Sequence, residues 1–201
     1  MSEPRLTLVG LVDWERRPPD WRERARTAAA ALDFLILRAK AQAAADQLTW
    51  ARDLRGLDCP LLVADRMDVA LAAEAAGVHL PERGLPAVEV RRLWPTAVIT
   101  RSIHHPPEAA EEDGVDWLIF GHLFATRSKP GLAPRGLGEA ARVVGRATRP
   151  VLGIGGVTPA TAGLAAAIGL AGLVAADGIW GAADPAAAAR AIRAAWSRGK
   201  G

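Results

Sequence analysis

Eight short apolar runs, separated by helix-like stretches, constrain the fold of this chain more than any other feature. Most are continuous series of Val, Ile, Leu and Ala, which is typical of strands covered on both faces in a parallel sheet. The expected strands span residues 6–12, 34–38, 61–65, 77–81, 97–101, 116–120, 151–155 and 172–176.

Ala-rich or amphipathic stretches between these runs predict helices. They cover residues 19–32, 43–56, 66–77, 158–169 and 184–196. Thr158 is the expected N-cap of the fourth helix, and Pro159 and Pro185 suit the first helical position of the last two. Gly56 and Gly77 are the expected stops of the second and third helices.

Alternating strands and helices over a chain of 201 residues predict an α/β protein with one domain, residues 1–201, folded as a single (β/α)8 TIM barrel. A doubly wound open sheet is the alternative. We disfavour it because such a sheet rarely needs eight strands in so short a chain.

Charge and composition indicate which partners and which cellular location to expect. The net charge is +3, but basic residues are scattered among acidic ones, with no basic block, so we expect no nucleic-acid partner. No uncharged apolar stretch reaches 18 residues and the N-terminus does not resemble a signal peptide, so we expect no membrane association. Cys59 is the only cysteine, which favours a reducing, cytoplasmic location and a buried thiol.

In a barrel of this kind function gathers at the carboxyl ends of the strands. The stretch "FGHLFATRSKPGLAPRG", residues 120–136, follows the sixth expected strand and places His122 at its end. Imidazole can accept and return a proton near neutral pH, so His122 is the expected catalytic acid–base. A structural histidine is the alternative. His79 lies inside an apolar run, and we expect it to pack in the barrel.

Two glycine turns predict a phosphate site. "GIGGVTP" places Gly155 and Gly156 directly before a helix, and "ADGIWG" places Gly178 after the last strand. Their backbone can approach an anion closely, and barrels often bind phosphate with the loops after strands seven and eight. Tight turns without a ligand are the alternative.

Several cations follow strand ends and could hold other negative groups of a substrate. They are Arg38, Lys40, Arg101 and Lys129. A solvated surface role is the alternative for any one of them, but four at one rim favour a binding site.

Six stretches resemble, in chain order, the landmarks of the thiamine phosphate synthase and TenI superfamily. They are "LILRAK", "LLVADRMDVALAAEAAGVHLP", "RSIHH", "FGHLFATRSKPGLAPRGL", "IGGVTP" and "DGIWGAADP", within residues 5–190. Gly-His-x-Phe after the sixth strand resembles the TenI branch, the thiazole tautomerases, whereas the synthase branch usually has Gly-Pro. "RSIHH" is similar to the TenI pattern Arg-Ser-Val-His-Ser.

The TenI resemblance implies an isomerase of thiamine biosynthesis. It would convert an exocyclic-alkene thiazole carboxylate phosphate to the aromatic thiazole, with no metal and no cofactor. The resemblance implies that His122 is the proton shuttle. It also implies that a wider set of residues contacts the carboxylate, the ring or the phosphate of the substrate. That set comprises Arg38, Lys40, Ser102, Thr126 and Lys129 for the substrate, and Gly155, Gly156, Asp177 and Gly178 for the phosphate.

The synthase branch is the alternative, a magnesium-dependent transferase that joins a pyrimidine diphosphate to a thiazole phosphate. Its Asn-Asp pair after strand three is Ala64-Asp65 here, and its next carboxylate is displaced, with Glu82 nearby. The Gln of its Gln-x-Arg-x-Lys pattern is Ile36. Since magnesium needs several oxygen ligands, these departures weaken the synthase reading.

Asp177 stands where the family often has Ser. A carboxylate would repel phosphate there, so either Asp177 points away and caps the next turn, or the ligand differs. On the repulsion hypothesis Asp177→Ser tightens phosphate binding. A barrel that binds a thiazole phosphate without turnover is therefore a third alternative. The relatives imply a homodimer.

Overall fold

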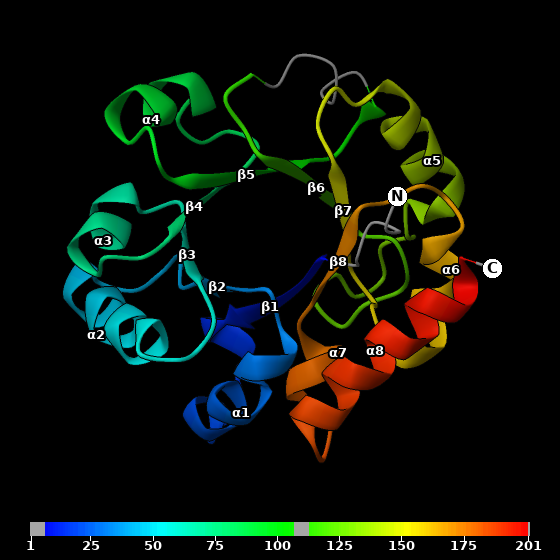
Figure 1. The fold of residues 1–201 in the computed structure, drawn as a ribbon, viewed down its shortest axis with the longest axis horizontal. Coiled ribbons are helices and arrows are strands. Elements are labelled where there is room, and N and C mark those ends of the chain that lie inside the picture. The colour runs from blue at the N-terminus through cyan, green and yellow to red at the C-terminus, as the bar shows by residue number, and fades with distance from the viewer. Residues whose placement is uncertain (1–6, 107–112, 201) are drawn as a thin grey trace.

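The computed structural model describes residues 7–106 and 113–200, and within them eight parallel strands close into a barrel (Figure 1). Each strand pairs with the next, and β1 closes the ring against β8. The strands are β1 Thr7–Asp13, β2 Phe34–Arg38, β3 Leu61–Ala64, β4 Gly77–Leu80, β5 Val98–Ile103, β6 Trp117–Gly121, β7 Val151–Ile154 and β8 Gly172–Ala175. The predicted (β/α)8 barrel is confirmed, and the open sheet is excluded.

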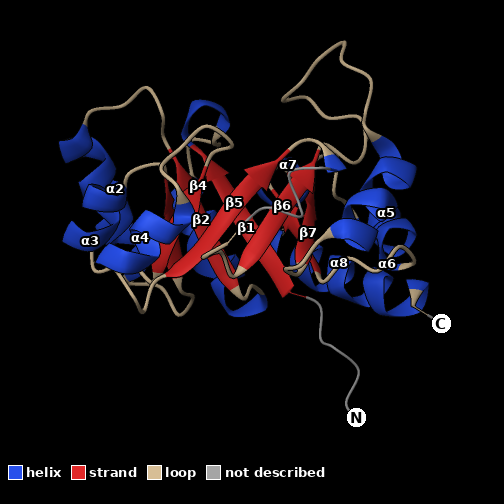
Figure 2. Cartoon of the chain, turned by 90° about the horizontal axis from the view of Figure 1, so that it is seen from above, coloured by secondary structure: helices blue, strands red, loops and turns tan. Residues whose placement is uncertain are grey.

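Helices cover the outside of the strand ring, as the side view in Figure 2 shows. They are α1 Trp21–Ala28, α2 Ala44–Arg55, α3 Met67–Ala72, α4 Ala87–Leu93, α5 Gly136–Arg146, α6 Pro159–Ala166, the short α7 Asp177–Trp180 and α8 Pro185–Gly199. Two 3-10 turns, Trp14–Arg16 and Ala29–Ala31, flank α1. The sequence pattern did not reveal α4, α5 or α7.

The helix signals at the start of α6 and α8 act as predicted. Thr158 and Thr161 form a reciprocal capping box at α6, whose first residue is Pro159. Asp184 accepts a hydrogen bond from the amide of Ala187, and Pro185 begins α8. Both caps satisfy amide donors that a helix N-terminus leaves unpaired.

The prediction that the third helix ends at Gly77 is wrong. The helix ends at Ala72, Glu74 adopts a φ of +52°, and Gly77 already belongs to β4. A Cβ at Gly77 would lie 1.9 Å from the carbonyl oxygen of Val98 on β5. Glycine is therefore required there by the close approach of two strands and not by a helix stop.

Apolar side chains form two separate cores, one between strands and helices and one inside the ring. The inner core consists of Val9, Leu11, Ile36, Leu62, Ala64, Ile119, Leu152 and Val174. Since strand residues alternate between faces, the next inward positions of β1 and β2 fall to Asp13 and Arg38. The strands thus carry polar side chains above a sealed apolar plug.

Two further sequence predictions have outcomes. Cys59 is buried, as expected, and burial raises the pKa of its thiol to about 12, so it stays protonated at neutral pH. In the part of the chain that the structure describes, no helix has the length and apolar character needed to cross a membrane.

Candidate functional site

Two adjoining cavities open at the carboxyl ends of the strands. The central cavity, about 340 Å³, lies over the apolar plug and is lined by Arg38, Lys40, His79, Ser102, His122 and Lys129, among others. The smaller cavity, about 210 Å³, is lined by Thr126, Arg127, Gly155, Gly156, Asp177 and Gly178, among others. Gly155 and Ser128 line both, so one ligand can extend from one cavity into the other.

His122 lines the central cavity and lies directly after β6. Its side chain is buried, and neither ring nitrogen has a hydrogen-bond partner within the described residues. Its carbonyl oxygen accepts a hydrogen bond from the amide of Arg135 at 3.0 Å, which fixes the backbone. A buried imidazole without protein partners is unusual, because buried polar atoms are normally paired. The ring lines the central cavity, and its two nitrogens are buried polar atoms whose hydrogen-bonding capacity the described residues leave unused.

His79 also lines the central cavity and does more than pack in the barrel. Its Nδ1 lies 2.9 Å from Thr100 Oγ1 and its Nε2 3.0 Å from Ser102 Oγ. Burial, reinforced by the charges of Lys40, Arg38 and Arg101, lowers the pKa of His79 from 6.5 to about 4. The ring is therefore neutral at pH 7 and orients the Ser102 hydroxyl. The sequence alone did not indicate this role for His79. It follows from the register of β4 and β5, which pairs His79 with Thr100.

The four cations expected at the rim have different surroundings. Arg38 contacts Asp13 at 2.9 Å and Glu15 at 3.6 Å. Arg101 is buried and donates to the carbonyl oxygens of Leu85 at 2.8 Å and Glu82 at 3.3 Å, so it supports the loop after β4.

Lys40 and Lys129 are the other two expected cations, and both line the central cavity. Neither forms an ion pair within residues 7–106 and 113–200. Their charges are thus the ones most available to a negative group of a ligand.

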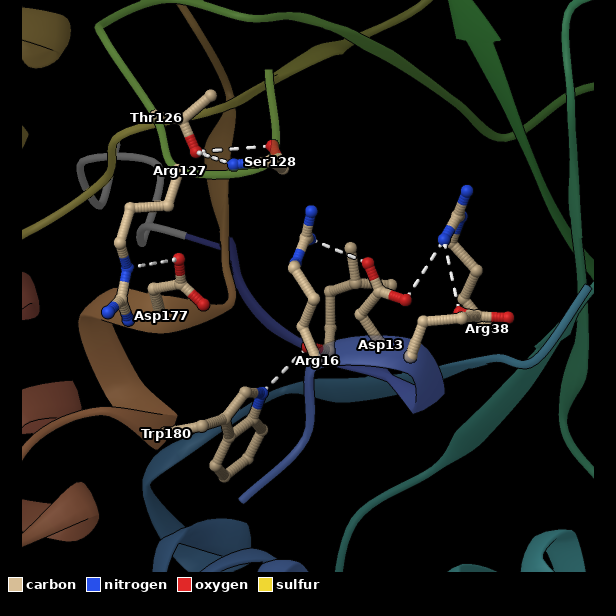
Figure 3. Close-up of polar contacts among 10 residues, drawn as sticks. Asp13, Arg16, Arg38, Thr126, Arg127, Ser128, Asp177 and Trp180 are labelled. Carbon is tan, nitrogen blue, oxygen red and sulfur yellow. Dashed lines mark hydrogen bonds and ion pairs between the residues drawn. The ribbon is translucent and has the colours of Figure 1, made fainter. Parts of the chain in front are cut away.

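Asp13 is a site residue that the sequence pattern did not reveal. It is buried at the end of β1, between Arg38 and Arg16, and contacts the latter at 2.6 Å (Figure 3). Burial and a hydrogen bond with Glu15 raise the pKa of Asp13, while the two arginines oppose that rise. Asp13 thereby holds Arg38 in one orientation beside the cavity.

The predicted phosphate glycines come together as a cradle without side chains. Gly155 and Gly156 have φ angles of +99° and +65°. A Cβ at Gly156 would lie 2.5 Å from the carbonyl oxygen of Ala125, and one at Gly178 would lie 2.0 Å from that of Val157. Glycine is therefore required at these positions, and the resulting surface is backbone that an anion can approach closely.

Asp177 and Thr126 lie beside this cradle rather than in the central cavity. Asp177 does not cap the following turn, which was one of the two alternatives for this residue, since Ala176 is the N-cap residue of α7 and no side chain caps that helix. Its carboxylate lies 3.3 Å from Nε of Arg127, a residue that the sequence pattern did not single out. Thr126 Oγ1 lies 3.2 Å from Ser128 Oγ, within the same loop as Arg127.

The described residues do not fit a magnesium site. Asp65 is exposed at the end of β3, and the Glu82 carboxylate lies 3.6 Å from His104 Nε2. Among the residues with described positions, no three His, Cys, Asp or Glu side chains are grouped so as to hold a metal ion. A hard divalent cation needs several oxygen ligands, which this rim does not gather.

A closed barrel with a glycine cradle and a basic cavity at the carboxyl ends of its strands is typical of proteins that bind small phosphorylated molecules. A family model described as thiamine monophosphate synthase matches residues 13–179. The chain therefore belongs to the thiamine monophosphate synthase and TenI family, as the resemblance implied.

Curated relatives carry names from thiamine biosynthesis. The chain is 43% identical over 145 residues to the thiamine biosynthesis bifunctional protein ThiM/ThiE of Symbiobacterium thermophilum, covering 70% of this chain and 30% of that protein. It is 41% identical over 136 residues to the thiamine-phosphate synthase of Laribacter hongkongensis, covering 66% of this chain and 64% of that one. In both, the match spans less than two thirds of the relative's length.

Solved structures agree with this family. The thiamine phosphate pyrophosphorylase of Pyrococcus furiosus superposes with a TM-score of 0.85 at 27% identity, covering 98% of both chains. A 3-hexulose-6-phosphate synthase, at 22% identity and a TM-score of 0.72, shares the fold. The names of the two curated relatives and of the Pyrococcus furiosus structure favour the synthase branch, and none of the three names a TenI protein.

Proposed function

We propose that the chain is an enzyme of thiamine biosynthesis that transfers a proton on a thiazole carboxylate phosphate, as the TenI-type tautomerases do. The observation that carries this proposal is His122, buried beside a glycine cradle with both ring nitrogens unpartnered within the described residues. A tautomerase needs a phosphate site, a cation for the carboxylate and one proton shuttle. Each has a candidate in the two cavities.

In the proposed reaction the phosphate rests against the backbone of Gly155, Gly156 and Gly178. Lys40 and Lys129 attract the carboxylate, and Arg38 and Ser102, which line the same cavity, contact the ring. His122 removes the proton from ring carbon two and returns a proton to the exocyclic carbon, while the double bond moves into the ring. The product is aromatic, so the reaction runs downhill, and a positioned acid–base contributes roughly 10²–10⁴-fold.

A thiamine-phosphate synthase is the second candidate, and the names of the relatives favour it. Arg38 and Lys40 also match the cations of the synthase pattern. Against it stands the poor fit of the described carboxylates to magnesium, so we derive no step through that ion. A protein that binds a thiazole phosphate without turnover is the third.

Proton NMR in heavy water with the exocyclic-alkene thiazole carboxylate phosphate tests the first candidate. Faster aromatisation with the protein than in buffer, lost in His122→Ala, would support the tautomerase. Product formation at the buffer rate would reject it.

The same sample then receives the pyrimidine diphosphate, magnesium and the aromatic thiazole phosphate. Thiamine phosphate formation would identify the synthase, and binding without either product would favour the non-catalytic reading. Sedimentation velocity of the same protein tests the homodimer that the relatives imply.

A further inference from the structure

Arg127 lies over the glycine cradle, on the loop that follows His122. The amide of Phe124 donates to the carbonyl oxygen of Gly155 at 3.1 Å, which holds the start of this loop against the cradle. Thr126, Arg127 and Ser128 then line the smaller cavity together with Asp177 and Gly178. Figure 3 shows the Arg127 and Asp177 side chains directed toward each other.

The ion pair between Arg127 and Asp177 is accessible and weakly held. The N–O distance is 3.3 Å, and the two side chains are 80% and 35% exposed. Exposed ion pairs contribute little to stability, so a competing anion can separate them easily. A phosphate monoester carries up to two charges and several oxygens, and a guanidinium binds such a group with two parallel hydrogen bonds.

The other cation of the smaller cavity is already engaged. Arg16 lines it too, but its guanidinium lies 2.6 Å from the buried carboxylate of Asp13. Lys40 and Lys129 line the central cavity. Arg127 is thus the cation best placed to meet an anion on the cradle, and Asp177 is the group that competes for it.

We propose that Arg127 is the charged phosphate ligand of this chain, and that Asp177 holds it over the empty cradle until the phosphate takes its place. The inference rests on the proposed function only in that a phosphorylated molecule occupies the cradle. It gives the carboxylate of Asp177 a role beside the phosphate site, as the group that positions Arg127 before the phosphate arrives. It also makes affinity depend on a cation that the glycine motifs do not contain.

Titration with inorganic phosphate, followed by calorimetry at fixed ionic strength, tests the exchange in four proteins. These are the wild type, Asp177→Ser, Arg127→Gln and the double variant, with Arg22→Gln as a control. Arg22 forms a comparable exposed pair with Asp53 on the outer surface, at 2.7 Å. All the substituted side chains are solvent-accessible, and thermal unfolding verifies that each variant folds.

We expect Asp177→Ser to bind phosphate about three- to tenfold more tightly than the wild type, because Arg127 is released. Adding Arg127→Gln to Asp177→Ser should weaken binding about tenfold, and Arg22→Gln should change nothing. Equal affinities of Asp177→Ser and the double variant would overturn the proposal, since Arg127 would then only neutralise Asp177.

Weaker or unchanged binding in Asp177→Ser would also overturn it, as would the absence of phosphate binding in every variant. Turnover plays no part in this measurement. A protein that shows the expected affinities but neither thiamine-pathway reaction would retain the exchange and lose the proposed function.

Discussion

The carboxylate of Asp13 lies 2.9 Å from the guanidinium of Arg38, and the two side chains close one wall of the central cavity. The same carboxylate contacts Arg16. The Asp13 carboxylate, at the end of β1, therefore neutralises part of the positive charge at this rim. The orientation of Arg38 depends on an acid from a different strand.

Asp13→Asn should lower the free energy of unfolding by about 1–3 kcal/mol, because it leaves Arg16 and Arg38 without their shared buried partner. Asp53→Asn is the matched control, since it removes the partner of Arg22 in an exposed pair. We expect that control to cost less than about 0.5 kcal/mol. Urea denaturation measures the free energy of unfolding of both variants. Equal losses would show that the burial of Asp13 adds nothing to the stability that its ion pairs provide.

His122→Gln should lower kcat for thiazole aromatisation by about 10²–10⁴-fold, because an amide acts neither as an acid nor as a base near neutral pH. Stability should hardly change, since no hydrogen bond of the ring to another described residue is lost. His105→Gln, at an exposed position after β5, is the control and should keep full activity. Retention of wild-type kcat by His122→Gln would remove this histidine from the mechanism.

Stability should fall as the pH drops from about 6.5 to about 4, because of His79. Its folded pKa is lowered to about 4 by burial and nearby cations, while the unfolded chain protonates near 6.5. Between these two pKa values the unfolded chain binds a proton at His79 that the folded protein does not. The free energy of unfolding therefore falls as the pH is lowered, by roughly 3 kcal/mol in total.

The variant His79→Gln tests this, because an amide does not titrate yet can still hydrogen-bond Thr100 and Ser102. Urea unfolding across this pH range should show a flatter profile for the variant. An unchanged slope would assign the effect to other groups.

Lys129→Gln should raise KM for the thiazole carboxylate phosphate about tenfold while changing kcat less, because its charge serves binding more than proton transfer. Lys200→Gln, at the exposed end of α8, is the control. Steady-state kinetics separate the two constants. A fall in kcat at constant KM would instead place Lys129 close to the reacting atoms.

Gly155→Ala should destabilise the protein by about 2–4 kcal/mol. The residue has a φ of +99°, and a Cβ there would lie 2.3 Å from the Cβ of His122. Gly145→Ala is the matched control, since Gly145 lies in α5 with no atom near its Cβ position, and it should stabilise by about 0.5–1 kcal/mol. Thermal unfolding distinguishes these opposite signs.

The strands were predictable because burial on both faces leaves a strong apolar signal, and every expected strand agrees with the structure to within about two residues at its ends. The true end of the third helix was not predictable, because the sequence does not distinguish a glycine required by packing between β4 and β5, such as Gly77, from one that ends a helix. Helix α4 was not predicted because the sequence lacks the usual helix signals there. Its short "AVEVRRL" run has no capping residue beside it.

The site was only partly predictable. Motifs placed His122 and the glycines correctly beside one another, since each follows a strand end. Contacts between residues far apart in the chain carry no signal in a single sequence, so the roles of Asp13 and Arg127 follow only from their distances to Arg38 and Asp177.

The contact between Gly155 and His122 also bears on how this site can evolve. As far as this contact is concerned, glycine at 155 leaves room for any residue at 122, so the residue after β6 can change while the loop after β7 stays as it is. The reverse does not hold, because any Cβ at 155 would lie 2.3 Å from the Cβ of residue 122. A descendant that gains a side chain at 155 must therefore rebuild the loop after β6 in the same lineage.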